Sequence, residues 1–316
     1  MNLHKVKDKD TDTCCIVCDS SDFRVYRQIL SRLNDIPPGL VRGNVVEVSI
    51  LKCTKCGLLR SHQEGEEGGK GPQIYEESIN LAQSISKISN DYSSAYTFDE
   101  LDWLGEPDRE NILEIGCSAG YFLIRARAKG WNAYGIDIDK NAIEYAQKNY
   151  NLNVTCGSMS ESSYPADFFK AIVMIGVLEH IPDPTDFLNM IQGFLKPEGV
   201  IMLAVPNVSS LNAKISRFSR HDWDMFCEPG HLYHFNIKTL SLLAERCGLA
   251  VSDWRTTTIK IRGKIPFLPV RIPKLERFLQ TLGKKNTLFR TIYEIVFRLL
   301  DWLKWGDILV VKLVRK

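Results

Sequence analysis

The region from Asn111 to Val205 alternates between short apolar runs and longer segments with helical spacing, and this pattern limits the fold more than any other feature. Successive parallel strands need a crossover connection, usually a helix. Alternation of strand and helix therefore predicts an α/β fold with helices on both faces of a parallel sheet. The predicted elements are the strands Asn111–Ile115, Ala133–Ile136, Ala171–Ile175 and Val200–Val205 and the helices Tyr121–Lys129, Lys140–Asn149 and Thr185–Leu195.

Three more elements are predicted further along the chain. Asn236 is a suitable N-cap for a helix that ends at Cys247, just before a glycine. The apolar residues of Val251–Ile261 and Ile308–Val314 have the spacing of strands. The sheet is therefore expected to continue beyond the regular alternation.

A glycine-containing turn joins the first predicted strand to the first helix, and it reads Glu114-Ile115-Gly116-Cys117-Ser118-Ala119-Gly120. Such turns let a ligand approach the backbone, and ligands of these sheets bind at the carboxyl ends of the strands. A dinucleotide fingerprint that starts at Gly116 would need glycine where this chain has Ser118 and Tyr121, and no P-loop sequence follows. The turn therefore favours a ligand without phosphates.

This turn resembles the first cofactor motif of class I S-adenosylmethionine-dependent methyltransferases, with Ser118 where glycine is most usual. The resemblance extends through four more motifs in the family's order, which are Asp137 at the end of a strand, Gly157–Met159, Val173–Pro184 and Leu195–Val200. It implies a Rossmann-like seven-stranded methyltransferase sheet with an antiparallel last strand, and S-adenosylmethionine as the methyl donor.

The resemblance also assigns cofactor-binding roles. The turn passes under the methionine part of the cofactor, Asp137 binds both ribose hydroxyls, and Ile138 packs on the adenine. A carboxylate is suited to the ribose because it can accept two hydrogen bonds. The alternative is that the glycines only make a tight turn and that Asp137 only caps the next helix. The implied cofactor-binding residues are Glu114, Gly116, Cys117, Ser118, Ala119, Gly120, Asp137, Ile138, Ser158, Met159 and Ile175.

Two Cys-x-x-Cys pairs, Cys15/Cys18 and Cys53/Cys56, precede this region. Four thiolates in tetrahedral geometry suit zinc, and such sites stabilise small folds. Cys14 is a neighbour that can take the place of Cys15 as a ligand. The alternatives are buried free cysteines and an iron–sulfur cluster, whereas a redox pair fits less well because neither pair follows a strand of a βαβ unit. The sequence therefore predicts a small zinc-ribbon-like module.

A zinc-binding module before a methyltransferase domain is similar to the sugar C-methyltransferases that act on nucleotide-linked deoxysugars and to their relatives in surface-polysaccharide biosynthesis. Cys53–Arg60 matches a segment typical of that group, although those enzymes carry another large domain after the methyltransferase domain. The predicted division of the chain is a flexible tail (1–13), a zinc-binding module (14–72) and a methyltransferase domain (73–316) with a helical insertion (264–305).

Three histidines are candidates for the proton acceptor that transfer to a hydroxyl or carbon acid requires. His180 follows the predicted strand at Ala171–Ile175, and His231 and His234 precede the helix that begins after Asn236. We rank His231 first, His180 second and His234 third as the proton acceptor. The alternative for each is a structural histidine that holds a loop by hydrogen bonds. Quinone-type O-methyltransferases bind a divalent ion through a Glu-x-x-Glu-His segment, but Gly176 replaces the first acid here, so no such ion is predicted.

The predicted acceptor is a small molecule, namely a nucleotide-linked or lipid-linked sugar or another glycan intermediate. The alternatives are O-methylation of a quinone-like or other small metabolite, methylation of RNA or protein, and a zinc-dependent interaction protein that has lost catalysis. The net charge of +2 gives no general reason to expect nucleic acid as a partner. The oligomeric state is left open.

The sequence also gives expectations for the cellular compartment and for the basic C-terminal region. Nine cysteines, an odd number, and a polar N-terminus without an apolar segment predict a cytoplasmic protein with reduced thiols. Residues 274–305 mix apolar and basic residues at helical spacing. This region is interpreted as a helix pair packed on the sheet edge, with a lid, an oligomer contact or peripheral attachment to the inner membrane surface as alternatives.

Overall fold

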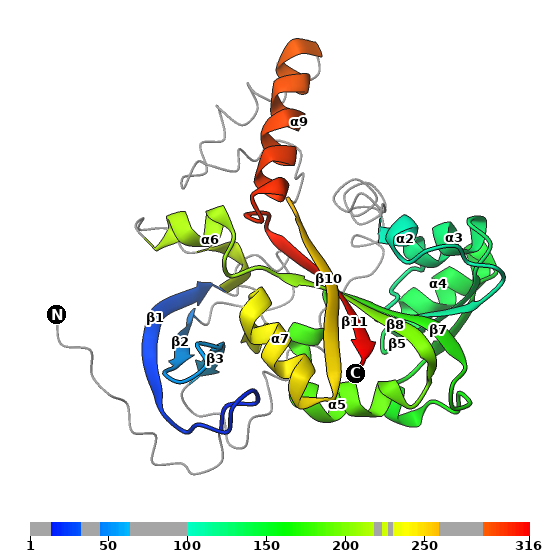
Figure 1. Ribbon diagram of the computed structural model, residues 1–316, viewed down its shortest axis with the longest axis horizontal. Coiled ribbons are helices and arrows are strands. Elements are labelled where there is room, and N and C mark those ends of the chain that lie inside the picture. The colour runs from blue at the N-terminus through cyan, green and yellow to red at the C-terminus, as the bar shows by residue number, and fades with distance from the viewer. Residues whose placement is uncertain (1–13, 33–44, 64–99, 218–222, 227–229, 259–286) are drawn as a thin grey trace.

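The computed structural model describes residues 14–32, 45–63, 100–217, 223–226, 230–258 and 287–316 (Figure 1). Their strands form a seven-stranded and a four-stranded sheet. The strands are β1 (Phe23–Arg32), β2 (Val45–Cys53), β3 (Leu59–Gln63), β4 (Asn111–Ile115), β5 (Asn132–Asp137), β6 (Asn153–Cys156), β7 (Phe169–Ile175), β8 (Leu195–Pro206), β9 (Tyr233–His234), β10 (Leu249–Thr257) and β11 (Ile308–Arg315). The α-helices are α2 (Glu100–Trp103), α3 (Tyr121–Ala128), α4 (Lys140–Tyr150), α5 (Pro184–Gln192), α6 (Leu211–Ser216), α7 (Ile237–Arg246) and α9 (Thr287–Trp302), and the 3₁₀ turns are η3 (Met159–Glu161), η4 (Leu178–His180) and η5 (Asp224–Phe226).

The seven-stranded sheet has the order β10-β11-β8-β7-β4-β5-β6. The neighbours from β8 to β6 pair in parallel, whereas β11 is antiparallel to both β8 and β10. This arrangement confirms the predicted α/β fold with an antiparallel last strand. The prediction missed β6, a four-residue strand with a single buried side chain, because so short and polar a segment carries no strand signal.

Successive side chains of the central strands enter different hydrophobic cores. Leu113 packs in a core with side chains of α5 and α7, whereas its neighbour Ile112 packs in a core with side chains of α2, α3 and α4. Such alternation follows from the two-residue period of a strand. The sheet is therefore covered on both faces, and the carboxyl ends of β4, β5 and β7 lie at one edge.

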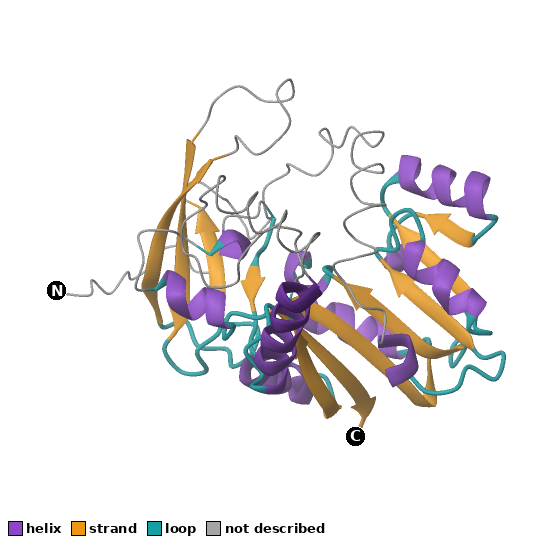
Figure 2. Cartoon of the chain, turned by 90° about the horizontal axis from the view of Figure 1, so that it is seen from above, coloured by secondary structure: helices purple, strands orange, loops and turns teal. Residues whose placement is uncertain are grey.

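The cysteine-bearing segment forms the four-stranded sheet β1-β2-β3-β9, which lies beside the main sheet (Figure 2). Its last strand, β9, comes from the C-terminal half of the chain, where His234 pairs with Leu59. Val17 and Leu58 share a hydrophobic core with Leu243 of α7. The segment therefore packs directly against the larger domain, and the domain boundaries in the sequence analysis stay a prediction.

Several predicted boundaries differ from the observed ones, and two elements illustrate the reason. The helix predicted to end at Leu195 ends at Gln192, because Leu195 already pairs with Phe169 as the first residue of β8. The strand predicted for Val251–Ile261 begins at Leu249 and ends at Thr257. In both cases pairing with a neighbouring strand sets the limits, and local spacing does not reveal it.

The predicted helical insertion at 264–305 lies partly outside the described residues, which resume with α9 at Thr287. This helix projects from the body of the molecule (Figure 1), and its Ile295, Leu299 and Trp302 side chains are exposed. No helix in the described part of the chain is long and apolar enough to span a membrane. Peripheral membrane contact through 274–305 and the cytoplasmic location both stay predictions.

Candidate active site and candidate metal centre

The turn between β4 and α3 has a backbone that only glycine accommodates at two positions. Gly116 and Gly120 have φ values of 74° and 79°, in the left-handed region. A Cβ at Gly116 would lie 2.5 Å from a methyl carbon of Val177, and one at Gly120 would collide with Leu152. Ser118, where the methyltransferase motif usually has glycine, also adopts a positive φ of 45°. The turn therefore accommodates serine in a left-handed conformation that favours glycine.

Asp137, at the end of β5, is tied to this turn. One of its carboxylate oxygens accepts a hydrogen bond of 2.7 Å from the Ser118 backbone N–H, and the other accepts one of 2.8 Å from Asp139. Burial raises the pKa of Asp137, against the effect of these N–H donors. The carboxylate can accept further hydrogen bonds at its remaining lone pairs, as the predicted grip on a ribose requires.

Glu114 is a buried carboxyl beside the turn. Its side chain is 5% exposed, and its Oε2 atom has no hydrogen-bond partner among the described residues. Burial raises the pKa of Glu114 well above its usual value, and the nearby charge of Asp137 adds to this effect. A buried polar atom without a partner is costly, so this oxygen fits a site that a donor group of a ligand completes.

The residues predicted to contact adenine lie next to Asp137. Ile138 is 69% exposed, which is unusual for so large an apolar side chain and leaves its face available to a ligand. The Gly157 backbone N–H donates to the Asp137 carbonyl oxygen, so the adjoining loop is fixed to the same strand end. Ser158 is the N-cap of η3 and donates hydrogen bonds from its backbone N–H and hydroxyl to the Glu161 carboxylate, whereas Met159 is buried in the core.

The remaining predicted cofactor residues are positioned by the core. Cys117 and Ala119 are buried, and Ile175 is half-buried at the end of β7. Their contribution is to fix the path of the backbone around the carboxyl ends of β4 and β7. S-adenosylmethionine fits this site for three reasons. The glycine turn lets a ligand approach the backbone, the buried Oε2 atom of Glu114 has no hydrogen-bond partner among the described residues, and Ile138 is an exposed apolar side chain beside Asp137.

The three predicted histidines lie close together in the structure, beside the segment that follows β7. The rings of His180 and His231 are 4.7 Å apart between centroids, and those of His231 and His234 are 6.4 Å apart. His180 is half-buried, whereas His231 and His234 are only 6% and 1% exposed. Accessibility therefore follows the order His180, His231, His234.

Backbone carbonyls fix the protonation of two of these rings. The Nδ1 atom of His180 lies 2.9 Å from the Gly230 carbonyl oxygen, and that of His231 lies 2.9 Å from the Met225 carbonyl oxygen. A carbonyl only accepts, so each Nδ1 carries the hydrogen and each Nε2 offers a lone pair. Burial lowers the pKa of His180, and it lowers that of His231 to about 4 with a contribution from His180, so both rings are neutral near pH 7.

Glu179 belongs to the same cluster and was not among the site residues predicted from the sequence. Its Oε1 atom lies 4.0 Å from the Nε2 atom of His231, and burial raises the pKa of Glu179 to about 8. Its position directly before His180 is a signal that could have been used. Ligand atoms of Glu179, His180 and His231 lie within 4.8 Å of one another, as in a metal site. The absence of a divalent ion here stays a prediction.

Aromatic side chains near the cluster have packing roles. Trp223 and Phe226 are buried in a third core with residues of β1, β2 and β3, and their ring centroids are 5.1 Å apart. The Tyr233 hydroxyl donates to the Pro182 carbonyl oxygen. These contacts give the three aromatic side chains structural roles.

Acid should destabilise the protein through His234. Burial lowers the pKa of His234 to about 3 in the folded state, whereas the unfolded chain titrates near 6.5. Below pH 6.5 the unfolded state therefore binds a proton at His234 that the folded state does not bind. The part of the unfolding free energy that depends on the neutral His234 is fully present above pH 6.5 and declines as the pH falls towards 3. Lowering the pH from 6.5 to 5 is expected to cost roughly 1.5 kcal/mol through this residue.

Urea denaturation at several pH values measures this effect. The variant His234→Asn should show a shallower loss of unfolding free energy between pH 6.5 and 5 than the unmodified protein. His62→Asn, at a half-buried histidine of β3, is the control and should keep the original slope. Equal slopes for the His234 variant and the unmodified protein would contradict the buried, neutral state of His234.

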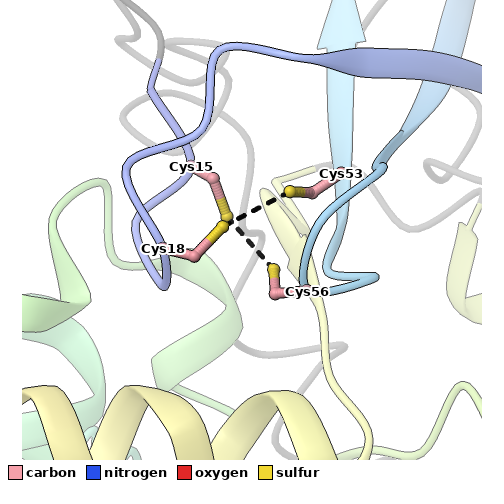
Figure 3. A group of neighbouring side chains, drawn as sticks. All are labelled: Cys15, Cys18, Cys53 and Cys56. Carbon is pink, nitrogen blue, oxygen red and sulfur yellow. Dashed lines mark hydrogen bonds between the residues drawn. The ribbon is translucent and has the colours of Figure 1, made fainter.

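The four predicted zinc ligands converge in the structure (Figure 3). The sulfur atoms of Cys15 and Cys56 are 3.4 Å apart, and those of Cys18 and Cys53 are 3.5 Å apart. All four lie within 4.8 Å of one another, close to the sulfur separations of about 3.8 Å around a tetrahedral zinc. Cys14 is exposed and outside this group, so Cys15 is the member that faces the cluster.

The chemistry of this cluster suits a cation. Burial raises the pKa of Cys15 and raises that of Cys56 to about 11. At Cys53 burial also acts to raise the pKa, but the backbone N–H donors and the thiols of Cys18 and Cys56 together outweigh it and lower the pKa to about 7. Buried thiols become thiolates when a metal ion compensates the charge. Cys15, Cys18, Cys53 and Cys56 would hold such an ion, whose role would be to stabilise the β2–β3 turn.

The sheet order, the glycine turn and the acid at the end of β5 define the class of S-adenosylmethionine-dependent methyltransferase domains. The sequence profile of a family described as a methyltransferase domain matches residues 90–253, just over half of the chain, and the chain belongs to this family. A chain in the Haloferax volcanii complex between a methyltransferase activator and a methyltransferase shares the fold. Its TM-score is 0.53 at 14% identity, over 74% of this chain and 94% of that one.

Two curated relatives are ubiquinone biosynthesis O-methyltransferases. That of Alkalilimnicola ehrlichii is 26% identical over 151 residues, covering 41% of this chain and 59% of the relative. That of Histophilus somni is 24% identical over 160 residues, covering 44% of this chain and 67% of the relative. The match thus spans about 59% of the first relative's length.

Proposed function

We propose that this protein transfers the methyl group of S-adenosylmethionine to a small-molecule acceptor whose proton is taken up by the histidine cluster. The observation that carries the proposal is the contact between the cofactor turn and this cluster. Val177 packs directly on Gly116, and its carbonyl oxygen accepts the backbone N–H of His180. The proton acceptor therefore stands beside the place where the methyl donor is expected.

S-adenosylmethionine supplies an electrophilic methyl group and leaves as the neutral thioether when the carbon–sulfur bond breaks. The chain must orient the acceptor and remove its proton. His180 is the most accessible of the three rings, so we assign it the contact with the acceptor. His231 packs behind it, and Glu179 lies against His231. This assignment places His180 before His231, the first choice of the sequence analysis.

A sugar or glycan intermediate is the leading acceptor. Support comes from the cysteine cluster, whose resemblance is to the sugar C-methyltransferases, and from its sheet, which includes β9 and so adjoins the histidines. A quinone-like acceptor is the second candidate, because two relatives are named ubiquinone biosynthesis O-methyltransferases. Both candidates are small molecules that carry a proton at the position to be methylated.

A mass-shift screen separates these acceptors. The protein is incubated with S-adenosylmethionine and either nucleotide-linked deoxysugars or hydroxylated quinols, and products that gain one methyl group are identified by mass spectrometry. Methylated sugars support the leading assignment, and methylated quinols alone support the second. Methylation of neither class, by folded protein that binds the cofactor, would contradict both.

Once an acceptor is known, the variant His180→Gln should lower kcat by about 100-fold or more, as expected for loss of a general base. The affinity for S-adenosylmethionine should change little, because the ring is not part of the cofactor turn. His231→Gln should lower kcat less, and His62→Gln serves as the histidine control. Unchanged kcat in the His180 variant would remove this residue from the proton-accepting role.

A further inference from the structure

Strand β3 of the cysteine-bearing sheet is hydrogen-bonded to the segment that carries two of the site histidines. Its Leu59 and Arg60 pair with His234 and Tyr233 of β9. The backbone N–H of Ser61 donates to the Leu232 carbonyl oxygen at 2.9 Å. Ser61 is therefore placed beside the histidine cluster although it lies about 170 residues earlier in the sequence.

The Ser61 hydroxyl contacts both histidines of this segment. Its Oγ atom donates to the His231 carbonyl oxygen at 2.7 Å and lies 3.0 Å from the Nε2 atom of His234. A serine hydroxyl has one hydrogen but two acceptor lone pairs. Since that hydrogen is used by the carbonyl of His231, the contact with His234 requires Nε2–H to donate to the Ser61 oxygen.

This contact gives His234 the opposite tautomer from its two neighbours. His180 and His231 carry the hydrogen on Nδ1, because each donates to a backbone carbonyl. His234 carries it on Nε2, and its Nδ1 atom is buried without a hydrogen-bond partner among the described residues. No other described contact of His234 selects a tautomer, so Ser61 alone makes this choice.

We propose that Ser61 is a positioning residue of the methyltransferase site, which fixes the tautomer of His234 and holds the main chain of His231 in place. This inference rests on the proposed function, because it assigns the cysteine-bearing sheet a part in the acceptor side of that site. The sheet then does more than stabilise the fold. It supplies the hydroxyl that sets the orientation of the histidine-bearing segment behind His180.

The β2–β3 turn links this role to the candidate metal centre. Cys53 ends β2, Cys56 precedes β3, and the Cys53 backbone N–H donates to the Leu58 carbonyl oxygen within the turn. Ser61 lies five positions after Cys56 along the chain. A bound ion at the cysteines would therefore hold the strand that delivers the hydroxyl.

Histidine tautomers can be observed without an acceptor or turnover. Nitrogen-15 spectra of the full-length, histidine-labelled protein near pH 7.5 distinguish Nδ1–H from Nε2–H rings, and single histidine variants assign the signals. We expect Nδ1–H signatures for His180 and His231 and an Nε2–H signature for His234. In Ser61→Ala the His234 signature should become a mixture of tautomers, whereas Ser61→Thr, which keeps the hydroxyl, should retain it.

Methyl transfer supplies the second readout. Ser61→Ala should lower kcat on the order of tenfold with unchanged affinity for S-adenosylmethionine, and Ser61→Thr should restore most of it. Ser49→Ala, on the adjacent strand β2, is the matched control. An Nδ1–H signature at His234, or the same signature and kcat in a folded Ser61→Ala variant, would overturn the proposal. Lack of methyl transfer by the unmodified protein would count against the proposed function instead, whatever the tautomer of His234.

Discussion

Replacing Cys53 by serine is expected to abolish stoichiometric metal binding and to lower the unfolding free energy by more than about 3 kcal/mol. Cys53 is fully buried, and its sulfur converges with those of Cys15, Cys18 and Cys56. The effect should be large because the cluster shares a hydrophobic core with α7. Loss of the ion would therefore disturb the packing of both sheets.

Cys14→Ser is the matched control for this experiment. Cys14 neighbours Cys15 in the sequence but is exposed and lies outside the cluster, so its replacement should leave metal content and stability unchanged. Metal content is measured by elemental mass spectrometry of the purified protein, and stability by thermal and urea denaturation. One zinc per chain in the unmodified protein and none in Cys53→Ser is the expected result. Equal metal content and stability in the two cysteine variants would contradict a structural metal centre.

Replacing Asp137 by alanine is expected to weaken binding of S-adenosylmethionine by about 100-fold or more. The carboxylate holds the cofactor turn through the Ser118 N–H and is the predicted acceptor for the ribose hydroxyls. Hydrogen bonds to a charged group are worth about 1.5–3 kcal/mol each, and losing two of them at a diol exceeds the 2.7 kcal/mol that corresponds to 100-fold.

Asp139→Asn is the control for the Asp137 variant. Asp139 caps α4 by accepting from the N–H groups of Asn141 and Ala142, and asparagine caps helices equally well. Calorimetric titration should find near-normal affinity in this variant and greatly reduced affinity in Asp137→Ala. Melting temperatures close to that of the unmodified protein would show that both variants are folded. Equal affinities in the two variants would remove Asp137 from the cofactor site.

The regular part of the fold could be predicted from the sequence because strand and helix alternate there with clear spacing. Asn111–Ile115 was predicted with the observed bounds, and the predicted last strand is confirmed as the antiparallel β11. The short strand β6 was missed, since its existence depends on pairing with β5 and not on its own composition. Pairing partners are a property of the folded chain.

The parts of the candidate site that are local sequence motifs could be predicted, whereas the parts that depend on tertiary contacts could not. The cysteines and the cofactor turn are local motifs, but the choice between Cys14 and Cys15 depends on which side chain faces inward. The role of Ser61 could not be foreseen, because β3 meets β9 only through the tertiary fold. Glu179 was overlooked for a similar reason, since the burial that raises its pKa arises from segments distant in the sequence.

Binding of S-adenosylmethionine at the turn between β4 and α3 is tested most directly by calorimetric titration of the intact, metal-replete protein, with S-adenosylhomocysteine as a competitor. We expect one site per chain, a dissociation constant on the order of micromolar, and displacement by the competitor. Absence of binding to protein that is folded and metal-replete would contradict the assignment of the cofactor site to this turn.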